Sequence, residues 1–216
     1  MAAVSIPRIT NIHLKRLGLR KKIYRRGLGV SPLSSSPANL RKANQMKGMP
    51  DIEIPRSAKV ALCRFNDHFK GFEKVEAVRR IFGEKAEEVL RSLKVEFFSS
   101  RWGYMGVSDE DGHLMVSTYY LKHGDAKEIY LDLIHELIHV KQFMDGEELF
   151  DDSFEYVDRP TEIEAYRLTI EEAKRIGMSD MEIYNYLKVY WMSDAEVAKL
   201  AETLGVNLPA KVSQSR

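Results

Sequence analysis

The chain has 216 residues, of which 44% are hydrophobic and 30% are charged, and its 33 basic and 32 acidic side chains give a net charge of +1. This composition is typical of a folded globular protein, and the single cysteine, Cys63, excludes an intramolecular disulfide and a cysteine-rich zinc module. No apolar run is long enough to span a membrane, and the N-terminus lacks the apolar core of a secretory signal. We therefore expect a cytoplasmic protein that does not bind membranes.

The first 50 residues differ in charge from the rest of the chain. They contain 11 lysine and arginine residues and no acidic residue, so residues 51–216 contain 33 − 11 = 22 basic and 32 acidic residues, a net charge of −10. Because this segment has no periodic apolar face, we predict a disordered basic arm. Three roles stay open: a solvated tail, a contact of residues 8–47 with nucleic acid or another polyanion, and organellar targeting.

We predict a folded domain over residues 51–208 and a short tail over 209–216. The segment IPRSAKVALCRFNDHF mixes apolar and basic residues and favours a helix. Residues 71–93 place apolar side chains at helical intervals, with a break at Gly83. Three segments rich in β-forming residues then predict a small sheet: VEFFSS, WGYMGVS and, after the turn SDEDG, HLMVSTYYL.

Helices dominate the remainder of the predicted domain. A long helix runs to about residue 146, and an acidic loop, EELFDDSFEYVD, follows it. Pro160 then occupies a first-turn position of a helix that stops at Gly177. The segments MSDMEI and MSDAEV each contain a capping box and predict two more helices. The expected fold class is α+β, with the sheet before residue 146 and a helical part over 160–205.

The segment LDLIHELIHVKQ, residues 131–142, places polar side chains in an otherwise apolar helix. At 100° per residue, one stripe of the helix contains Glu128, Asp132, His135, His139 and Gln142, with Glu136 at its margin. A polar stripe inside a core is costly unless its groups are satisfied. Two histidines four residues apart leave the same face of a helix and can share one tetrahedral Zn²⁺ ion.

The spacing His-Glu-x-x-His also indicates a reaction. Glu136 points away from the metal but reaches a water molecule that the metal acidifies, which is the place of a general base. We therefore predict that His135 and His139 bind Zn²⁺ and that Glu136 is catalytic. The alternative is a coincidental pair of core histidines that donate to backbone carbonyls. Histidine–carboxylate sites also accept Co²⁺, Mn²⁺ or Fe²⁺.

The HELIH motif resembles the signature of the zincin metallopeptidases, and the resemblance extends over roughly residues 90–175. It implies a small mixed or antiparallel sheet packed on the motif helix, one Zn²⁺ per chain and hydrolysis of peptide bonds. It also implies that residues 114–121 form the edge strand of the sheet and pair with an extended peptide substrate. The substrate-binding residues of that strand would be Met115, Val116, Ser117 and Thr118.

Two histidines leave the metal short of one protein ligand. The segment Glu162-Ile-Glu-Ala is similar to the Glu-x-x-Ala motif of gluzincins, the zincins with a glutamate ligand, which implies Glu162 as the third ligand. Glu164 points about 200° away around the helix and would be solvated or lie behind the ligands. Asp145 is the alternative ligand, as in metzincins, although Gln142 stands where that pattern requires glycine.

A zinc hydrolase also needs a group that stabilises the oxyanion. Tyr166 stands where gluzincins commonly have aspartate, and it would orient an active-site histidine differently. Tyr156 and Arg159 also lie near the ligands in sequence, and the sequence does not choose among the three. We predict a zinc-dependent peptidase that acts on a peptide or protein. The alternative is a zincin-fold regulatory or nucleic-acid-associated module that contacts a polyanion through its basic arm.

Overall fold

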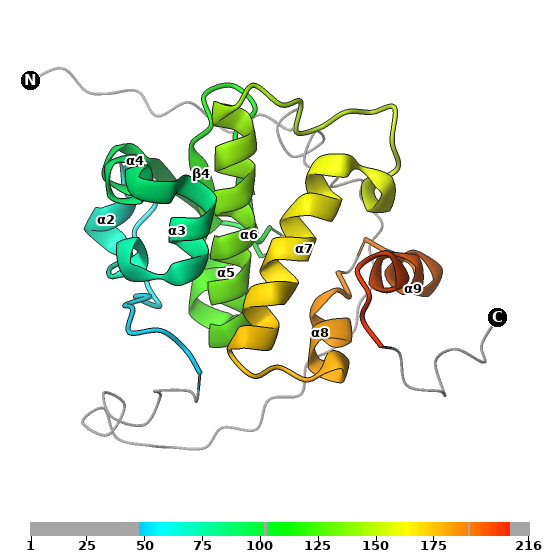
Figure 1. Ribbon diagram of the computed structural model, residues 1–216. Helices are drawn as coiled ribbons and strands as arrows, with labels where there is room; N and C mark the ends of the chain where they lie inside the picture. The colour runs from blue at the N-terminus through cyan, green and yellow to red at the C-terminus, as the bar shows by residue number, and fades with distance from the viewer. Residues whose placement is uncertain (1–47, 102, 190, 208–216) are drawn as a thin grey trace, which may run out of the picture. The chain divides into compact units, whose positions relative to one another are not determined.

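A computed structural model describes residues 48–101, 103–189 and 191–207, all within one compact unit, Gln45–Arg216. Most of the predicted arm, including all of residues 8–47, and the whole predicted tail lie outside the described residues. The described elements form a mixed α/β fold (Figure 1). In chain order they are β1 (Ala61–Arg64), α2 (Phe65–His68), η1 (Phe72–Lys74), α3 (Glu76–Phe82), η2 (Gly83–Lys85), α4 (Ala86–Ser92), β2 (Lys94–Phe98), β3 (Met105–Val107), β4 (Leu114–Ser117), α5 (Thr118–His123), α6 (Ala126–Met144), η3 (Tyr156–Asp158), α7 (Pro160–Arg175), α8 (Asp180–Tyr186) and α9 (Asp194–Thr203).

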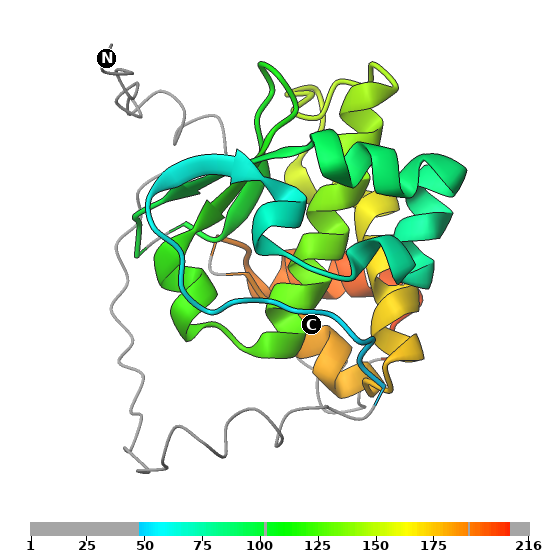
Figure 2. The same cartoon turned by 90° about the vertical axis from the view of Figure 1, so that its left-hand side faces the viewer.

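The four strands form one mixed sheet in the order β1-β2-β4-β3, seen beside helix α6 in Figure 2. Strand β2 is antiparallel to β1 and parallel to β4, with Val95 opposite Leu114 and Phe97 opposite Val116. Strand β3 pairs antiparallel with β4. Strand β4 has a partner on each side, and all four of its side chains, which point alternately to the two faces of the sheet, are buried. Such a strand reads as a continuous apolar run rather than as an alternating pattern.

The predicted edge strand is wrong in two respects. Met115, Val116 and Ser117 lie in β4, which is an interior strand, and Thr118 begins helix α5. The chain leaves the strand at Ser117, whose hydroxyl accepts a hydrogen bond from the Tyr120 backbone N–H at 3.3 Å. This serine cap overrides the β-forming character of the residues that follow it. The outer strands of the sheet are β1 and β3.

The helix predicted from residue 54 onwards is also partly wrong. Residues Ala61–Arg64 form strand β1, which pairs with β2 with Ala61 opposite Phe97, and only Phe65–His68 are helical. Pairing with a neighbouring strand, which is distant in sequence, decides the conformation here. The break predicted at Gly83 is confirmed, since this residue has φ 61° and separates α3 from α4.

Helix α6 lies at the centre of the described residues and contacts both the sheet and the other helices. It packs against α3, β3 and above all α7, which runs beside it in Figure 1. A buried polar contact links the two long helices: the hydroxyl of Tyr130 donates to Glu172, and Arg175 holds the same carboxylate at 2.6 Å. These contacts fix the relative position of the two helices that carry the predicted metal ligands.

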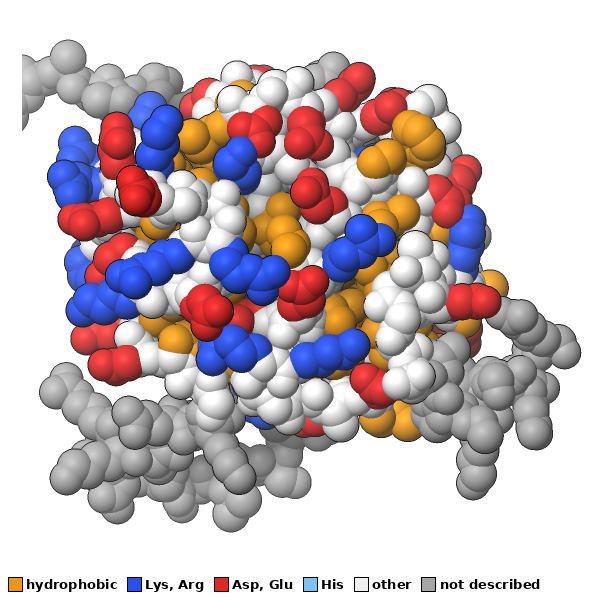
Figure 3. Space-filling view, viewed as in Figure 1, with side chains coloured by type: hydrophobic (Ala, Val, Ile, Leu, Met, Phe, Trp, Pro, Cys, Tyr) orange, Lys and Arg blue, Asp and Glu red, His pale blue; other side chains and the backbone are white. Residues whose placement is uncertain are grey.

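The two predicted capping boxes are confirmed. At α8, the Ser179 hydroxyl accepts from the Glu182 backbone N–H at 3.3 Å and the Glu182 carboxylate accepts from the Ser179 N–H at 2.8 Å. Ser193 and Glu196 repeat this arrangement at α9. On the face shown in Figure 3, basic and acidic side chains are intermingled. Among the described residues, no helix has both the length and the apolarity that a membrane crossing requires.

Candidate metal centre

Helix α6 begins at a well-formed cap and places both histidines of the motif on its buried side. The carboxylate of Asp125 accepts from the backbone N–H groups of Lys127 and Glu128, at 2.8 and 3.3 Å, and so satisfies the free donors of the first turn. His135 and His139 are each 7% exposed. Their imidazole rings meet edge to face, with centroids 4.7 Å apart, as the four-residue spacing requires.

Helix α7 supplies the third group. Its first residue is Pro160, whose missing N–H costs nothing at this position and whose fixed φ suits a helix. Glu162 therefore lies in the first turn, facing α6, and is 5% exposed. The Arg159 guanidinium lies 4.0 Å from the other carboxylate oxygen of Glu162. The predicted third ligand is thus placed beside the histidines by a helix start that the sequence encodes locally.

The donor atoms of these three side chains converge on one point. The Nε2 atoms of His135 and His139 are 3.0 Å apart, and the Oε2 atom of Glu162 lies 3.4 and 3.6 Å from them. A tetrahedral zinc ion bound at about 2.0–2.1 Å has ligand atoms about 3.3–3.4 Å apart. The observed spacings bracket this value, so shifts of a few tenths of an ångström would let the three side chains bind such an ion.

One carboxylate oxygen supports the same interpretation. The Oε2 atom of Glu162 is buried and has no hydrogen-bond partner among the described residues. An unsatisfied buried carboxylate oxygen is costly, and the great majority of buried polar atoms have a partner. A cation between the two imidazoles and this oxygen would remove the cost. His135, His139 and Glu162 are also the only His, Cys, Asp and Glu side chains in the described residues whose donor atoms cluster in this way.

The three groups shift one another's protonation. Burial opposes ionisation of Glu162, but the nearby His139 and His135 outweigh it and hold the pKa of the carboxyl far below its usual range. Burial likewise disfavours charge on His139, yet the Glu162 carboxylate raises its pKa to about 9. The pKa of His135 is lowered by burial and by the charge of His139. The centre therefore combines an ionised carboxylate with a neutral His135 and a protonated His139, whose proton a divalent cation would displace on binding.

Glu136 lies next to the first histidine and is only partly buried. Desolvation raises the pKa of its carboxyl to about 8, while the charge of His139 acts in the opposite direction. A carboxyl group with a pKa near neutrality can both accept and return a proton, as a general base requires. The role of Glu136 as a general base stays a prediction.

The structure places the three candidates for oxyanion stabilisation, Tyr156, Arg159 and Tyr166, close to the ligands. The Tyr166 ring packs on the His135 ring with centroids 4.5 Å apart, and its hydroxyl lies 2.9 Å from the Tyr156 hydroxyl. Arg159 approaches Glu162 and also donates from Nε to the Asp151 carbonyl at 3.3 Å. Tyr166 therefore supports the histidine through its ring face and not through a hydrogen bond to the imidazole.

The alternative third ligand is placed elsewhere. Asp145 caps the C-terminus of α6, is exposed, and forms an ion pair with Lys141 on the same helix. It does not belong to the cluster of donor atoms around the histidines. The metzincin pattern needs a glycine at position 142, where the chain turns out of the helix. This chain has Gln142 there, and α6 continues as a helix through that residue.

Three more polar side chains, Gln142, Glu164 and Asp132, lie in or beside the centre, and the sequence predicted a contact for none of them. Gln142 is buried and contacts His139, and Glu164 contacts Gln142. Asp132, one turn before Glu136, accepts hydrogen bonds from Tyr120 and Tyr186 at 2.6 and 2.9 Å. The sequence signal for Gln142 and Asp132 was their place on the same helical stripe as the histidines. Their partners come from α5, α7 and α8, which no local pattern indicates.

A chain of aromatic rings leads from the histidines to the surface. Trp191 and Tyr104, at its outer end, are 39% and 40% exposed. Rings in such contact form an apolar wall suited to an apolar group of a ligand. The successive pairs and the distances between their centroids are His135 and Tyr166 (4.5 Å), Tyr166 and Tyr156 (6.4 Å), Tyr156 and Trp191 (6.1 Å), and Trp191 and Tyr104 (6.2 Å).

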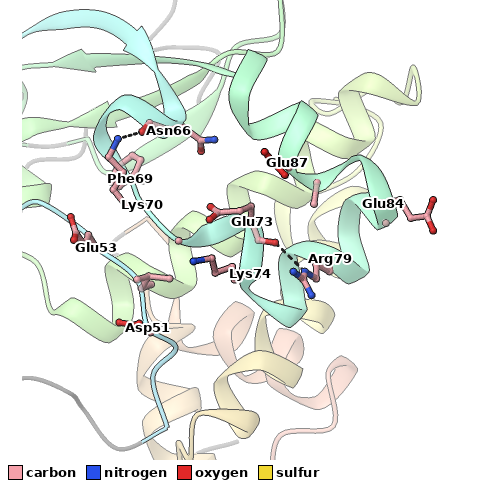
Figure 4. Close-up of a pocket in the computed structure, with 14 residues that line it drawn as sticks. Asp51, Glu53, Asn66, Phe69, Lys70, Glu73, Lys74, Arg79, Glu84 and Glu87 are labelled. Atoms are coloured by element: carbon pink, nitrogen blue, oxygen red, sulfur yellow. Dashed lines mark hydrogen bonds between the residues drawn. The ribbon is translucent and has the colours of Figure 1, made fainter.

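A surface hollow of about 1110 Å³ lies elsewhere, between the segment before β1 and helices α2 to α4 (Figure 4). None of the metal-centre residues lines it. Its walls carry both acidic side chains, such as Glu53 and Glu73, and basic ones, such as Lys70 and Lys74. Arg79 already donates to the Glu73 carbonyl at 3.0 Å. Walls of mixed charge favour no single class of ligand, and we assign no site there.

Comparison of the chain with protein-family models, with curated proteins and with solved structures finds no match. The candidate function therefore depends on the geometry of the centre and on the chemistry of its residues.

Proposed function

We propose that this protein is a zinc-dependent metallopeptidase with a zincin-like fold. The observation that carries the proposal is the convergence of His135 Nε2, His139 Nε2 and Glu162 Oε2 at 3.0, 3.4 and 3.6 Å from one another. These spacings suit one tetrahedral ion, and three protein ligands leave a fourth position open, as catalytic zinc sites do. A purely structural zinc site would instead be closed by a fourth protein ligand, and it would give Glu136 no role.

The residues of the centre divide the reaction between them. A bound zinc ion supplies a Lewis acid that polarises a peptide carbonyl and acidifies a water molecule. Glu136 would accept a proton from the attacking water at its carboxylate and return it to the leaving amine as the peptide bond breaks. The oxyanion would be stabilised by one of three nearby hydrogen-bond donors, which are Tyr156, Arg159 and Tyr166.

The substrate strand is reassigned in this proposal. Strand β3, Met105–Val107, is an outer strand of the sheet and contacts α6, whereas β4 is enclosed by two neighbours. An extended peptide can pair only with an outer strand. We therefore place the substrate beside β3, with the exposed rings of Tyr104 and Trp191 next to it and suited to an apolar side chain.

A second candidate function belongs to the basic arm. The observation in its favour is the charge of residues 1–50, with 11 basic and no acidic side chains, beside a remainder of net charge −10. Such a segment binds polyanions by releasing their counterions. In this alternative the metal-binding domain is carried to a nucleic acid or another polyanion by its N-terminal residues.

The substitution Glu136→Gln tests the proposed reaction. Because the amide cannot accept a proton but leaves the ligands in place, we expect the variant to retain about one zinc ion per chain while its rate of peptide hydrolysis falls at least ~100-fold. Cleavage of an unfolded protein substrate, followed by mass spectrometry of the products, measures the rate. The control is Glu171→Gln, at an exposed carboxylate of α7 that pairs with Arg80. An active Glu136→Gln variant would overturn the assignment.

A further inference from the structure

We propose that Gln142, supported by Glu164, is a positioning residue that sets the tautomer of His139 and holds the turn carrying Glu162 beside it. The inference rests on the proposed metal centre and concerns how the chain prepares that centre before the ion binds. Gln142 is 2% exposed, and a buried amide of this kind is expected to satisfy both its donors and its acceptor.

The contacts of Gln142 determine the orientation of its amide. One end of the group lies 2.7 Å from His139 Nδ1. The other end lies 3.0 Å from the backbone carbonyl of Thr161 and 2.7 Å from the Glu164 carboxylate, and both of these groups are acceptors. The end with two acceptors around it must be the NH₂ group, so the end beside His139 is the carbonyl oxygen.

This orientation fixes the proton of His139. A carbonyl oxygen can only accept, so His139 Nδ1 carries hydrogen and donates to Gln142. When a metal displaces the other ring proton, the lone pair is on Nε2, the atom that faces His135 and Glu162. Histidine ligands of metals commonly donate their second N–H in this way, which orients the ring and raises the basicity of the ligating nitrogen.

The same amide also connects two ligands from different helices. Thr161 immediately precedes Glu162 in the first turn of α7, and Glu164 lies in the next turn. By donating to both, Gln142 ties α7 to α6 at the residue next to the third ligand. One side chain thus governs the direction of the His139 ring and the distance of Glu162 from it.

His135 has no comparable support. Its Nδ1 atom is buried and has no hydrogen-bond partner among the described residues, and its ring is held by packing against Tyr166 at 4.5 Å. Of the two imidazole rings, therefore, only that of His139 is oriented by a hydrogen bond from its Nδ1 atom. Removal of the Gln142 amide should therefore weaken metal binding, because it frees both the His139 ring and the turn that carries Glu162.

Zinc affinity, measured by competition with a chelating dye, tests this inference without reference to hydrolysis. For Gln142→Ala we expect about 10- to 100-fold weaker binding than in the wild type. The matched control, Lys141→Ala, removes an exposed neighbour on the same helix and should leave the affinity unchanged. The visible spectrum of the Co²⁺-loaded protein reports the ligand geometry, and it should change in Gln142→Ala but not in the control.

An exchange of the two side chains provides a rescue. In Gln142→Glu alone, the introduced carboxylate faces the Glu164 carboxylate, so zinc binding should weaken. In Gln142→Glu combined with Glu164→Gln, the introduced carboxylate accepts from His139 and the introduced amide donates to it, so affinity and Co²⁺ spectrum should return part of the way toward the wild type. The Thr161 carbonyl loses its donor in both variants, which limits the recovery. This comparison decides the question even if Gln142→Ala does not fold.

Two results would overturn the inference: Gln142→Ala or Gln142→Glu binding zinc as tightly as the wild type, or an exchange variant no better than Gln142→Glu. Failure of the peptidase proposal has a different signature. The wild type would then bind zinc and the Gln142 variants would bind it more weakly, but neither the wild type nor Glu171→Gln would cleave any peptide.

Discussion

At the scale of single residues, the centre depends on side chains that control one another's charge. Glu162 stays ionised in a buried position because two imidazoles face it, and Glu136 has a raised pKa because burial dominates its surroundings. The pattern His-Glu-x-x-His predicted His135, Glu136 and His139 directly, since four-residue spacing on a helix fixes which side chains meet. The sequence could not establish the contacts of Gln142, because the carbonyl of Thr161 is an acceptor that any residue could offer.

Asp132 leads to a prediction about pH. Burial raises the pKa of its carboxyl from the ordinary value of 3.8 to about 6, although the Tyr120 and Tyr186 hydroxyls donate to it. Between these values the folded chain holds a proton that the unfolded chain has released. The contribution of Asp132 to the free energy of unfolding must therefore fall as pH rises through this window.

The substitution Asp132→Asn isolates this contribution, because the amide does not titrate. Urea unfolding of both proteins in the presence of a chelator, at several pH values from 4 to 7, gives the difference in free energy of unfolding. We expect the wild type to lose stability relative to Asp132→Asn as the pH rises. A constant difference would show that Asp132 has the same pKa in the folded and unfolded chains, and a stability of the wild type that rises with pH relative to Asp132→Asn would show that folding lowers the pKa; either result would contradict the prediction.

At the scale of elements, local signals succeeded where a cap or a proline defines the boundary. Pro160 and the two capping boxes gave the starts of α7, α8 and α9. The predictions were wrong at β1, where pairing with β2 replaces the expected helix, and at the end of β4, where the Ser117 cap starts helix α5. The sequence could not show that β4 is an inner strand of the sheet, because a continuous apolar run does not indicate how many strands pair with it.

The capping box of α9 allows a stability prediction. Replacing Ser193 by alanine removes the acceptor for the Glu196 N–H, and we expect a loss of about 1 kcal/mol in the free energy of unfolding. Chemical denaturation of Ser193→Ala and Ser193→Thr measures this, since threonine retains the capping hydroxyl and should lose less. Equal stability of the alanine variant and the wild type would show that α9 does not depend on this cap.

At the scale of the whole molecule, charge is the feature that the metal centre does not explain. The 11 basic side chains of residues 1–50 precede a remainder of net charge −10. Residues 51–216 have a negative net charge and would attract nucleic acid only weakly, so binding of a polyanion would depend on the N-terminal residues. The two proposed functions can therefore be tested separately by deletion.

Deletion of residues 1–47 tests this separation. We expect the full chain to bind heparin or duplex DNA with an affinity that falls steeply as salt is increased, because counterions are released on binding. The deleted protein should lose this binding but keep its zinc affinity, whereas deletion of residues 209–216 should change neither property. Polyanion binding that survives the loss of residues 1–47 would contradict the role assigned to them.

The central claim is that His135, His139 and Glu162 bind one zinc ion, and metal content per chain tests it most directly. Elemental mass spectrometry of the purified wild type and of the variants His135→Ala, Glu162→Ala and Asp145→Ala provides the measurement. We expect about one zinc ion per chain in the wild type and in Asp145→Ala, and little or none in the other two variants. A wild type that holds no metal after reconstitution with zinc, or a Glu162→Ala variant that keeps its metal while Asp145→Ala loses it, would contradict the claim.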